Sequence, residues 1–432
     1  MRVCQLKLTS FRNYQELVFT PGENINILHG KNAQGKSNVL EALWLLATTR
    51  SLRAGRESEL ILRDCEMAHV TAEVDREREG DAELQVSVFQ GDKKAVRVNG
   101  LKRPRVVDLL GQFNAVFFGS IDLVIITGEP SDRRHYLNLE ISQISPRYVY
   151  DLGHYKRTLE QRNRLLRDLR ERPRPVADSG LDAWNEQLVR FGAPLYEKRR
   201  FYLERLAPLA DQIHRELTDG SEGLEIRYLP SVALPKESPV HMVRETSREE
   251  SYLAAAQAET GTESTGESAN EKAPESPLSG TETIAKAFRE QLREVAADEA
   301  RRGTTLLGPQ RDDINFLING ADARIYGSQG QQRTVALALK LAEFRLIEDY
   351  VGEPPVMLLD DVMSDLDDIR RTHLLAWVRR RCQTFITCTN LRSFPKEILA
   401  EATTFEVVAG TVTPDGTRKS RSTKPKTSSI GA

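Results

Sequence analysis

Gly30-Lys31-Asn32-Ala33-Gln34-Gly35-Lys36-Ser37 decides the fold, because its glycines, lysine and serine have the spacing of a complete phosphate-binding loop. A short apolar segment, residues 23–28, precedes the loop, and residues 38–47 follow with apolar side chains at helical spacing. Glycine adopts the backbone angles that wrap a phosphate, and the N–H groups of a helix start face the anion. Strand, loop and helix together predict a nucleoside triphosphate site, in which Lys36 reaches the β- and γ-phosphates and Ser37 ligates Mg²⁺.

The acidic half of this site is expected far along the chain. Residues 356–359 form an apolar run typical of a central parallel strand, and Asp360 ends it. A carboxylate there can hold Mg²⁺ through water, and Asp361 is placed to polarise an attacking water. Two adjacent acids could instead cap a turn, but the apolar run favours the nucleotide interpretation. Residues 385–389 are predicted to form a further strand whose end approaches the γ-phosphate.

A third motif, Ser328-Gln329-Gly330-Gln331-Gln332-Arg333, lies just before the acidic strand. A Ser-x-Gly-Gln turn in this position, added to the loop and the acidic strand, indicates that ATP is bound between two copies of the chain.

Composition fits a large protein without membrane association. The chain has 432 residues, with 39% hydrophobic and 29% charged residues, so two or three lobes are expected. No apolar run approaches the length of a membrane span, and polar residues interrupt the N-terminus where a signal peptide would be apolar. Four cysteines without paired or metal-type spacing indicate free thiols in a reducing cytoplasm. The net charge of −2 excludes a globally basic nucleic-acid binder but allows a basic patch.

Four regions are expected along the chain. Residues 1–128 form the N-terminal half of an ATPase head with the phosphate-binding loop (Walker A), in which Asn99-Gly100 is predicted to form a turn. Residues 129–303 form a helical lid domain, with helical stretches predicted over 148–170 and 181–217. It contains a disordered acidic insertion at about 246–282, since that stretch is too polar to bury a core. Residues 304–410 form the C-terminal half of the head, with the signature turn, the acidic strand (Walker B) and the following D-loop. Residues 411–432 form a disordered basic tail.

Arginines are dense in the lid and just after the loop helix. Their functional interpretation is a DNA-facing surface. The alternative is a solvated helix face, which charge alone favours because acidic residues are interleaved with the arginines. The residues concerned are Arg157, Arg162, Arg164, Arg167, Arg170, Lys198, Arg199, Arg200 and Arg205 in the lid, and Arg50, Arg53 and Arg56 after the loop helix.

The chain resembles a known family in several of these motifs. Phe11-Arg12-Asn13-Tyr14, the loop with Gln34, the 328–333 turn and Asp360-Asp361 followed by residues 364–367 are similar to the RecF family. These proteins are bacterial recombination mediators whose head resembles those of SMC proteins and ABC ATPases. Stretches 128–134 and 308–313 are also similar. The likeness spans residues 1 to about 409, except for the acidic insertion.

The resemblance implies an α/β fold: a P-loop ABC-type ATPase head of two lobes with an inserted helical lid. It implies a protein that binds ATP and Mg²⁺, forms an ATP-dependent homodimer, and binds double-stranded and gapped DNA. Such a protein acts in DNA replication and recombinational repair, and promotes RecA loading with RecO and RecR. Hydrolysis would be slow and stimulated by DNA, with ATP serving as a switch.

Site roles carry over by position. Residues 30–37 hold the nucleotide; Ser37 and Asp360 hold the metal; Asp360 and Asp361 are catalytic, with Asp361 where transporters have Glu. Ser328, Gly330 and Gln331 complete the partner subunit's site. Two departures stand out: Gln310 replaces the family's usual His, and no His follows residues 385–389, where Thr389 or Asn390 would substitute.

Three alternatives share these motifs. An ABC transporter ATPase would carry a compact helical insert before the signature and usually a switch histidine. An SMC or SMC-like repair head would place hundreds of heptad residues between the half-motifs, and the sequence has none. In a non-enzymatic alternative, ATP is only a conformational clamp.

Overall fold

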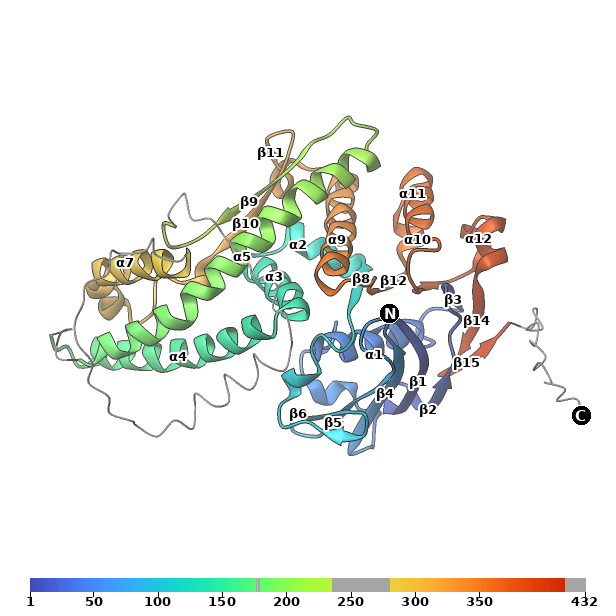
Figure 1. The fold of residues 1–432 in the computed structure, drawn as a ribbon, viewed down its shortest axis with the longest axis horizontal. Coiled ribbons are helices and arrows are strands. Elements are labelled where there is room, and N and C mark those ends of the chain that lie inside the picture. Colours follow the sequence, from blue (N-terminus) through green and yellow to red (C-terminus); the bar gives the residue numbers. More distant parts are fainter. Residues whose placement is uncertain (176, 178, 235–279, 416–432) are drawn as a thin grey trace, which may run out of the picture.

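Two bodies make up the protein: a sheet-containing head and an elongated helical lid (Figure 1). The structure is a computed structural model and describes residues 1–175, 177, 179–234 and 280–415. The acidic insertion predicted at 246–282 therefore lies outside the described residues, except for its last three. Those three begin helix α7 (Gly280–Arg302), so the expectation of disorder is wrong for residues 280–282.

A six-stranded, mainly parallel sheet carries the predicted site, with the order β15-β14-β3-β13-β12-β8. The non-sequential order places β13 between the strand that enters the loop, β3, and the acidic strand, β12, and all three are parallel. Every residue of β12 is buried, as predicted for a central parallel strand. The bounds are β3 (Ile25–His29), β8 (Ala115–Gly119), β12 (Val356–Asp360), β13 (Thr384–Cys388), β14 (Thr403–Val408) and β15 (Thr411–Pro414).

Strand β15 corrects one expectation. It pairs antiparallel with β14, from Val408 and Thr411 outward. The tail predicted to be disordered from residue 411 is therefore ordered over 411–415, and the remainder, 416–432, lies outside the described residues. The two-residue turn at 409–410, with φ values of 46° and 77°, allows the chain to reverse here.

The second layer of the head is an antiparallel sheet of order β2-β1-β4-β5-β6-β7. As predicted, Asn99-Gly100 forms a hairpin turn, with φ values of 53° and 74°, and joins β6 to β7. The bounds are β1 (Arg2–Phe11), β2 (Tyr14–Phe19), β4 (Met67–Asp75), β5 (Ala82–Phe89), β6 (Lys93–Val98) and β7 (Leu101–Lys102).

Helix α1 (Lys36–Thr48) lies between the two sheets and contacts strands of both. Almost all of its residues are buried, which explains why its apolar residues surround the helix instead of forming one stripe. The helix start is thereby held firmly at the carboxyl end of β3, where a parallel sheet of this type binds its ligands.

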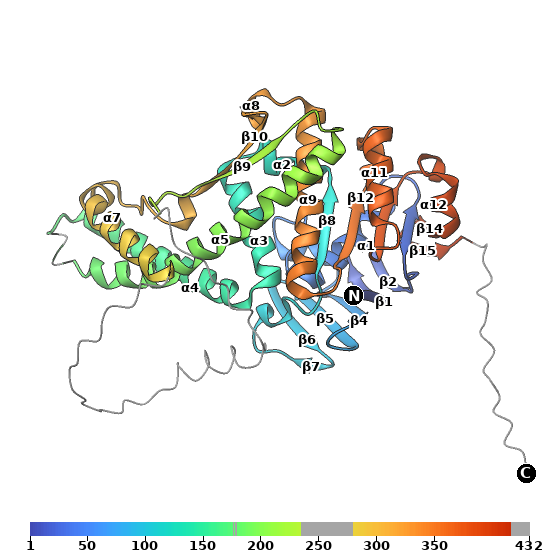
Figure 2. The same cartoon turned by 45° about the horizontal axis from the view of Figure 1, so that its top comes forward.

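The lid consists of long helices, and a small sheet of order β11-β10-β9 joins it to the head, because β9 follows α5 whereas β10 and β11 belong to the segment 304–410 predicted for the head. Helix α5, the longest, begins and ends where the sequence predicted and packs against α4, α7 and α9. The bounds of the lid helices and of this joining sheet are α3 (Pro130–Ile144), α4 (Pro146–Glu171), α5 (Leu181–Leu217), α7, β9 (Leu224–Leu229), β10 (Asp313–Ile318) and β11 (Ala321–Asp322). Figure 2 shows α5 running from the far end of the lid to the helices above the parallel sheet.

Two of the lid arginines are neither solvated nor available to DNA. Arg162 is fully buried, and its guanidinium lies 2.5 Å from Glu299 and 2.7 Å from the Thr305 hydroxyl. Arg199 is 2% exposed and donates to Asp312 at 2.8 Å and to the Pro309 carbonyl at 2.6 Å. Neither interpretation of the arginine-rich helices holds for this pair, which ties the lid helices to the chain returning to the head.

The remaining helices complete the head and its junction with the lid. Their bounds are α2 (Leu123–Thr127), α8 (Ala323–Tyr326), α9 (Gln329–Val351), α10 (Val362–Asp365), α11 (Asp368–Val378) and α12 (Lys396–Glu401), with short 3-10 turns at 57–60, 106–109, 120–122, 309–311 and 391–393.

Within the described ranges, none of the helices combines the length and apolarity that crossing a bilayer would need. All four cysteines are free thiols, as predicted.

Candidate nucleotide-binding site

The loop between β3 and α1 requires glycine at both ends. Gly30 has φ 147° and Gly35 has φ 113°, values that side chains with a Cβ rarely adopt. A Cβ at Gly30 would lie 2.4 Å from the Val407 carbonyl oxygen, and one at Gly35 would lie 2.6 Å from Asn13 Nδ2. Val407 and Asn13 therefore pack too closely against the loop for a side chain at either position.

Lys36, the first residue of α1, curls back over the loop. Its Nζ donates hydrogen bonds to the carbonyls of Gly30 (2.7 Å) and Lys31 (2.8 Å). Burial lowers the pKa of the Lys36 ammonium, which Asp361 and Asp360 nearby partly offset. A phosphate seated on the loop would supply the negative charge that this partly desolvated cation lacks.

The predicted metal ligands meet although they lie 323 residues apart in the chain. Ser37 Oγ donates to Asp360 Oδ1 at 2.6 Å. Hydroxyl and carboxylate oxygens are the ligands that Mg²⁺ prefers, and Mg²⁺ usually takes one or two carboxylates together with substrate phosphates. Accordingly, no group of three or more His, Cys, Asp or Glu side chains in the described part of the chain could hold a metal unaided. The donor set fits a magnesium ion that arrives with a nucleotide.

Asp360 has two further partners. Thr387 Oγ1, from the neighbouring strand β13, donates to Asp360 Oδ1 at 2.7 Å, because the strand register places the two residues side by side. The guanidinium of Arg53 forms an ion pair with Asp360 Oδ2. Arg53 was predicted only as part of a basic DNA surface, and its position in the sequence, after the far end of α1, did not indicate that it reaches the site. With Arg53 and Thr387 bound, Asp360 is 8% exposed.

Asp361 has an unusual backbone. Its φ of 54° is left-handed, which costs a non-glycine residue roughly 1 kcal/mol, and the Thr387 hydroxyl accepts its backbone N–H at 2.9 Å. Burial raises the pKa of its carboxyl group, and the neighbouring Asp360 and Asp365 raise it further. Such a carboxylate accepts a proton more readily than a free aspartate, which suits a general base for water.

The 11–14 motif supports the loop from behind. Asn13 Nδ2 donates to the Gln34 carbonyl at 3.0 Å, and the Tyr14 hydroxyl donates to the Gly35 carbonyl at 3.0 Å. Arg12 forms two hydrogen bonds with Glu41 of α1, at 2.8 and 2.9 Å. These residues therefore hold the loop and its helix in register without occupying the nucleotide's place.

The Gln34 side chain faces the C-terminal hairpin. Its Oε1 accepts the Ala409 N–H at 2.8 Å, while its backbone carbonyl accepts the Gly410 N–H at 3.2 Å. The β14–β15 turn thus contacts the loop. Sequence analysis missed this role because the strand after the turn, residues 411–414, was predicted to be part of a disordered tail.

The signature turn lies at the start of α9, apart from the loop. Ser328 caps the helix: its Oγ accepts the Gln331 N–H at 3.2 Å, and Gln331 Oε1 accepts the Ser328 N–H at 2.8 Å. Ser328 and Gly330 are exposed. Among the described residues, no hydrogen bond or ion pair joins residues 328–331 to residues 30–37 of the same chain. The exposed signature is therefore accessible to another molecule.

Helix α9 is nevertheless tied to the segment after the acidic strand. Arg333 donates to the Asp365 carbonyl at 3.1 Å, so the signature helix contacts the D-loop. Gln310 lies elsewhere: its Nε2 donates to the Leu307 carbonyl at 2.9 Å, and its Oε1 accepts the Tyr155 hydroxyl. Asn390 caps a short helix by accepting the Arg392 N–H at 3.0 Å. A switch role for Thr389 or Asn390 stays a prediction.

Comparisons with known proteins agree with this geometry. Residues 2–409 match the model of the RecF/RecN/SMC N terminal domain family. The DNA replication and repair protein RecF of Oceanobacillus iheyensis is 38% identical over 412 residues, covering 95% of this chain and all of that protein. The RecF of Symbiobacterium thermophilum is 39% identical and covers 96% and 99%. A solved structure of the recombination mediator protein RecF with ATP in the RecFOR pathway has a TM-score of 0.79 at 32% identity, covering 96% and 97% of the two chains. The chain belongs to the RecF family of DNA replication and repair proteins.

Proposed function

We propose that this protein is an ATP-dependent DNA clamp that acts in DNA replication and in recombinational repair of gapped DNA. It binds ATP with Mg²⁺, closes as a homodimer around the two nucleotides, and holds double-stranded or gapped DNA. With RecO and RecR it promotes RecA loading. Support for the pathway comes from relatives named as DNA replication and repair proteins and from a similar structure of RecF with ATP in the RecFOR pathway.

One observation supports dimerisation most strongly. Lys36, Ser37 and Asp360 lie together, whereas the exposed signature at Ser328 has no contact with the loop of its own chain among the described residues. A signature that completes a nucleotide site must therefore meet the loop of a second copy. Two such contacts would form in a symmetric dimer, because the same surfaces serve on both subunits.

Hydrolysis is proposed to be slow and to act as a switch. Asp361 is one methylene shorter than the glutamate of fast ABC ATPases, so it holds the attacking water less closely. Its strained backbone and raised pKa fit a general base. We expect a weak ATPase that DNA stimulates, with turnover well below the roughly 10 per second typical of enzymes.

A transporter ATPase remains the alternative with the most shared motifs. The long lid helices α4, α5 and α7 pack on one another, and the relatives above carry a repair name, so the clamp is favoured. Gapped DNA, and not membrane fractions, should stimulate ATP turnover.

Sedimentation with and without ATP tests the dimer. Ser328→Arg places a bulky cation where the partner's γ-phosphate must be contacted, so the dimer should be lost while monomeric ATP binding is kept. Lys36→Met should lose both. Gln212→Arg, on the exposed side of α5, is the matched control and should dimerise normally. Persistent ATP-dependent dimerisation of Ser328→Arg would refute the assignment.

A further inference from the structure

A lid carboxylate holds the side chain of the signature glutamine. Gln331 Nε2 donates to Glu222 Oε1 at 2.8 Å, and the other oxygen of Glu222 lies 3.2 Å from His214 Nε2. We propose that Glu222 is a positioning residue for the signature: it fixes Gln331, and through it Ser328, in the orientation that meets the nucleotide of a second copy. This inference rests on the proposed ATP-dependent dimer and deepens it.

Gln331 is held at both ends of its planar amide. Oε1 accepts the Ser328 N–H, while Nε2 reaches Glu222. A free glutamine side chain would lose on the order of 1–2 kcal/mol of rotamer entropy when it is ordered at an interface. Glu222 removes this cost in advance, because the side chain is already fixed before the second copy arrives.

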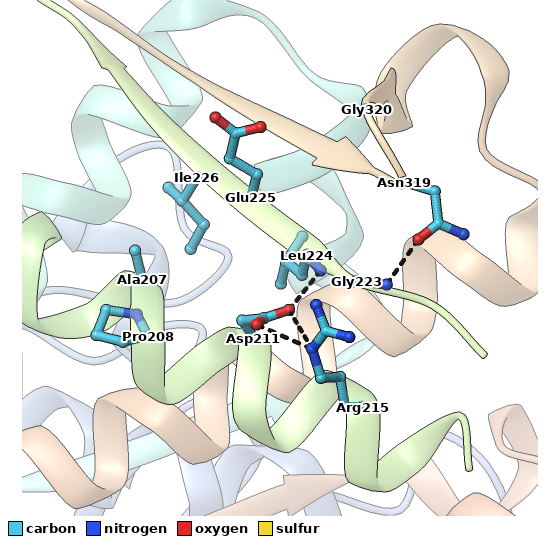
Figure 3. A pocket seen from close by; sticks show the side chains of 10 residues that line it. All are labelled: Ala207, Pro208, Asp211, Arg215, Gly223, Leu224, Glu225, Ile226, Asn319 and Gly320. Carbon is cyan, nitrogen blue, oxygen red and sulfur yellow. Dashed lines mark hydrogen bonds and ion pairs between the residues drawn. The ribbon is translucent and has the colours of Figure 1, made fainter. Parts of the chain in front are cut away.

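Glu222 is itself firmly placed, because the chain on its C-terminal side is anchored. The Gly223 N–H donates to Asn319 Oδ1 at 2.8 Å, and the Leu224 N–H donates to Asp211 Oδ1 at 2.8 Å. Figure 3 shows these contacts, with Asp211 also bound to Arg215, along an open depression of about 470 Å³ between α5 and β9. The loop after α5 is therefore attached both to α5 and to the β10–β11 turn.

His214 supplies a second donor to the carboxylate. Its side chain is fully buried on α5, and burial lowers the pKa of the ring, so the neutral form is favoured. A carboxylate only accepts, so Nε2 carries the proton; Nδ1 has no hydrogen-bond partner within the described structure. Glu222 thus joins the last turns of α5 to the first turn of α9.

Glu222 lies on a continuous path of contacts from the far end of the lid to the segment after the acidic strand. Helix α5 packs against α4 and α7 at the far end of the lid and against α9 near the signature. Arg333 then links α9 to the D-loop carbonyl of Asp365. A shift of α5 caused by a ligand on the lid would reach the signature through Glu222.

The test measures the ATP-dependent dimer by sedimentation equilibrium. Glu222→Ala should weaken dimerisation about fivefold per signature, and so about 25-fold for a dimer with two signatures, which corresponds to a net hydrogen bond of ~1 kcal/mol each. Glu222→Gln keeps an oxygen that accepts from Gln331 and should stay within about threefold of wild type. Glu225→Ala, an exposed carboxylate nearby that pairs with Arg227, is the control and should not change the dimer.

Binding of a fluorescent ATP analogue to dilute monomer, where the signature is unused, should be equal in all variants. Unchanged dimerisation of Glu222→Ala would overturn the inference. So would equal weakening in Glu222→Gln and Glu222→Ala, because only Glu222→Gln keeps an oxygen that can accept the hydrogen bond from Gln331. If Glu222→Ala melts early, Glu222→Asp, whose carboxylate is withdrawn by one methylene, takes its place with the same expected weakening. A wild-type protein that stays monomeric with ATP would instead refute the proposed function itself.

Discussion

Lys340, on the signature helix, offers the sharpest test of how head and lid are joined. Its side chain is 2% exposed, with Nζ 2.8 Å from Glu343, 3.4 Å from Glu140 and 3.9 Å from Asp122. Asp122 follows β8, and Glu140 belongs to α3, so one ammonium group joins α9 to the edge of the parallel sheet and to the first lid helix. Lys340→Met keeps the length of the side chain and removes its charge.

The stability that Lys340→Met should lose follows from the buried carboxylates around this lysine. Burial raises the pKa of Glu343, and it raises the pKa of Asp122 to about 6, so these groups already resist ionisation with the lysine present. Breaking a buried ion pair on one side costs about 3–5 kcal/mol at pH 8. At about 2 °C per kcal/mol for a protein of this size, the Tm should fall by about 6–10 °C.

The pH dependence of stability gives a second test of the Lys340 ion pairs. A carboxyl whose folded pKa is raised binds more protons in the folded than in the unfolded state, so stability falls as pH rises. The loss caused by Lys340→Met should therefore grow from about pH 4, the ordinary aspartate value, through pH 6 and above.

Thermal melts of wild type and variant at pH 5.5 and pH 8 measure both effects. Lys286→Met, which replaces an exposed lysine of α7, is the control and should leave the Tm unchanged. A Tm within about 2 °C of wild type at pH 8 would refute the reasoning, since one kcal/mol accounts for that much. So would a loss of equal size at both pH values.

Three further outcomes are expected. Asp361→Asn removes the proton acceptor, so single-turnover hydrolysis should fall by about a hundredfold or more and a long-lived ATP dimer should accumulate; unchanged turnover would exclude Asp361 from catalysis. DNA binding should require ATP, ignore sequence and weaken on the order of a hundredfold between low and physiological salt by fluorescence anisotropy; salt-insensitive binding would contradict a clamp on phosphates. Because burial lowers the pKa of His214, the folded protein should lose stability as pH falls through about 6.5, the ordinary histidine value. His214→Asn should therefore reduce the slope of Tm against pH in this range, and an unaltered slope would mean that His214 does not titrate there.

Several elements could be predicted from local sequence. The loop of residues 30–37, the apolar strand β12, the Asn99-Gly100 turn and the bounds of α5 all follow from patterns spanning a few residues to a few helical turns. Such patterns report backbone angles and the burial of one face, which neighbouring residues largely set. The placement of catalytic and metal roles on Ser37, Asp360 and Asp361 used the same local signals together with a family resemblance.

Side-chain partners could not be predicted in this way. Arg162 and Arg199 lie on the same helices as the exposed arginines, yet both are buried against acids more than a hundred residues away. Charge patterning cannot separate these cases, because a long cation looks alike in sequence whether water or a distant carboxylate surrounds it. Sequence analysis missed strand β15 for the same reason. This strand forms because it pairs with β14 and because the turn between them contacts Gln34 of the loop.

By itself, the sequence determined that a phosphate-binding loop opens a helix and that an acid pair ends a buried strand, since both are local consequences of glycine freedom and apolar runs. Only the tertiary structure decided that Ser37 touches Asp360, that Arg53 shares that carboxylate, and that Glu222 holds Gln331. Each of these contacts joins segments whose separation in the chain carries no information about distance. The sheet order and the packing of α5 on α9 bring them within hydrogen-bond reach.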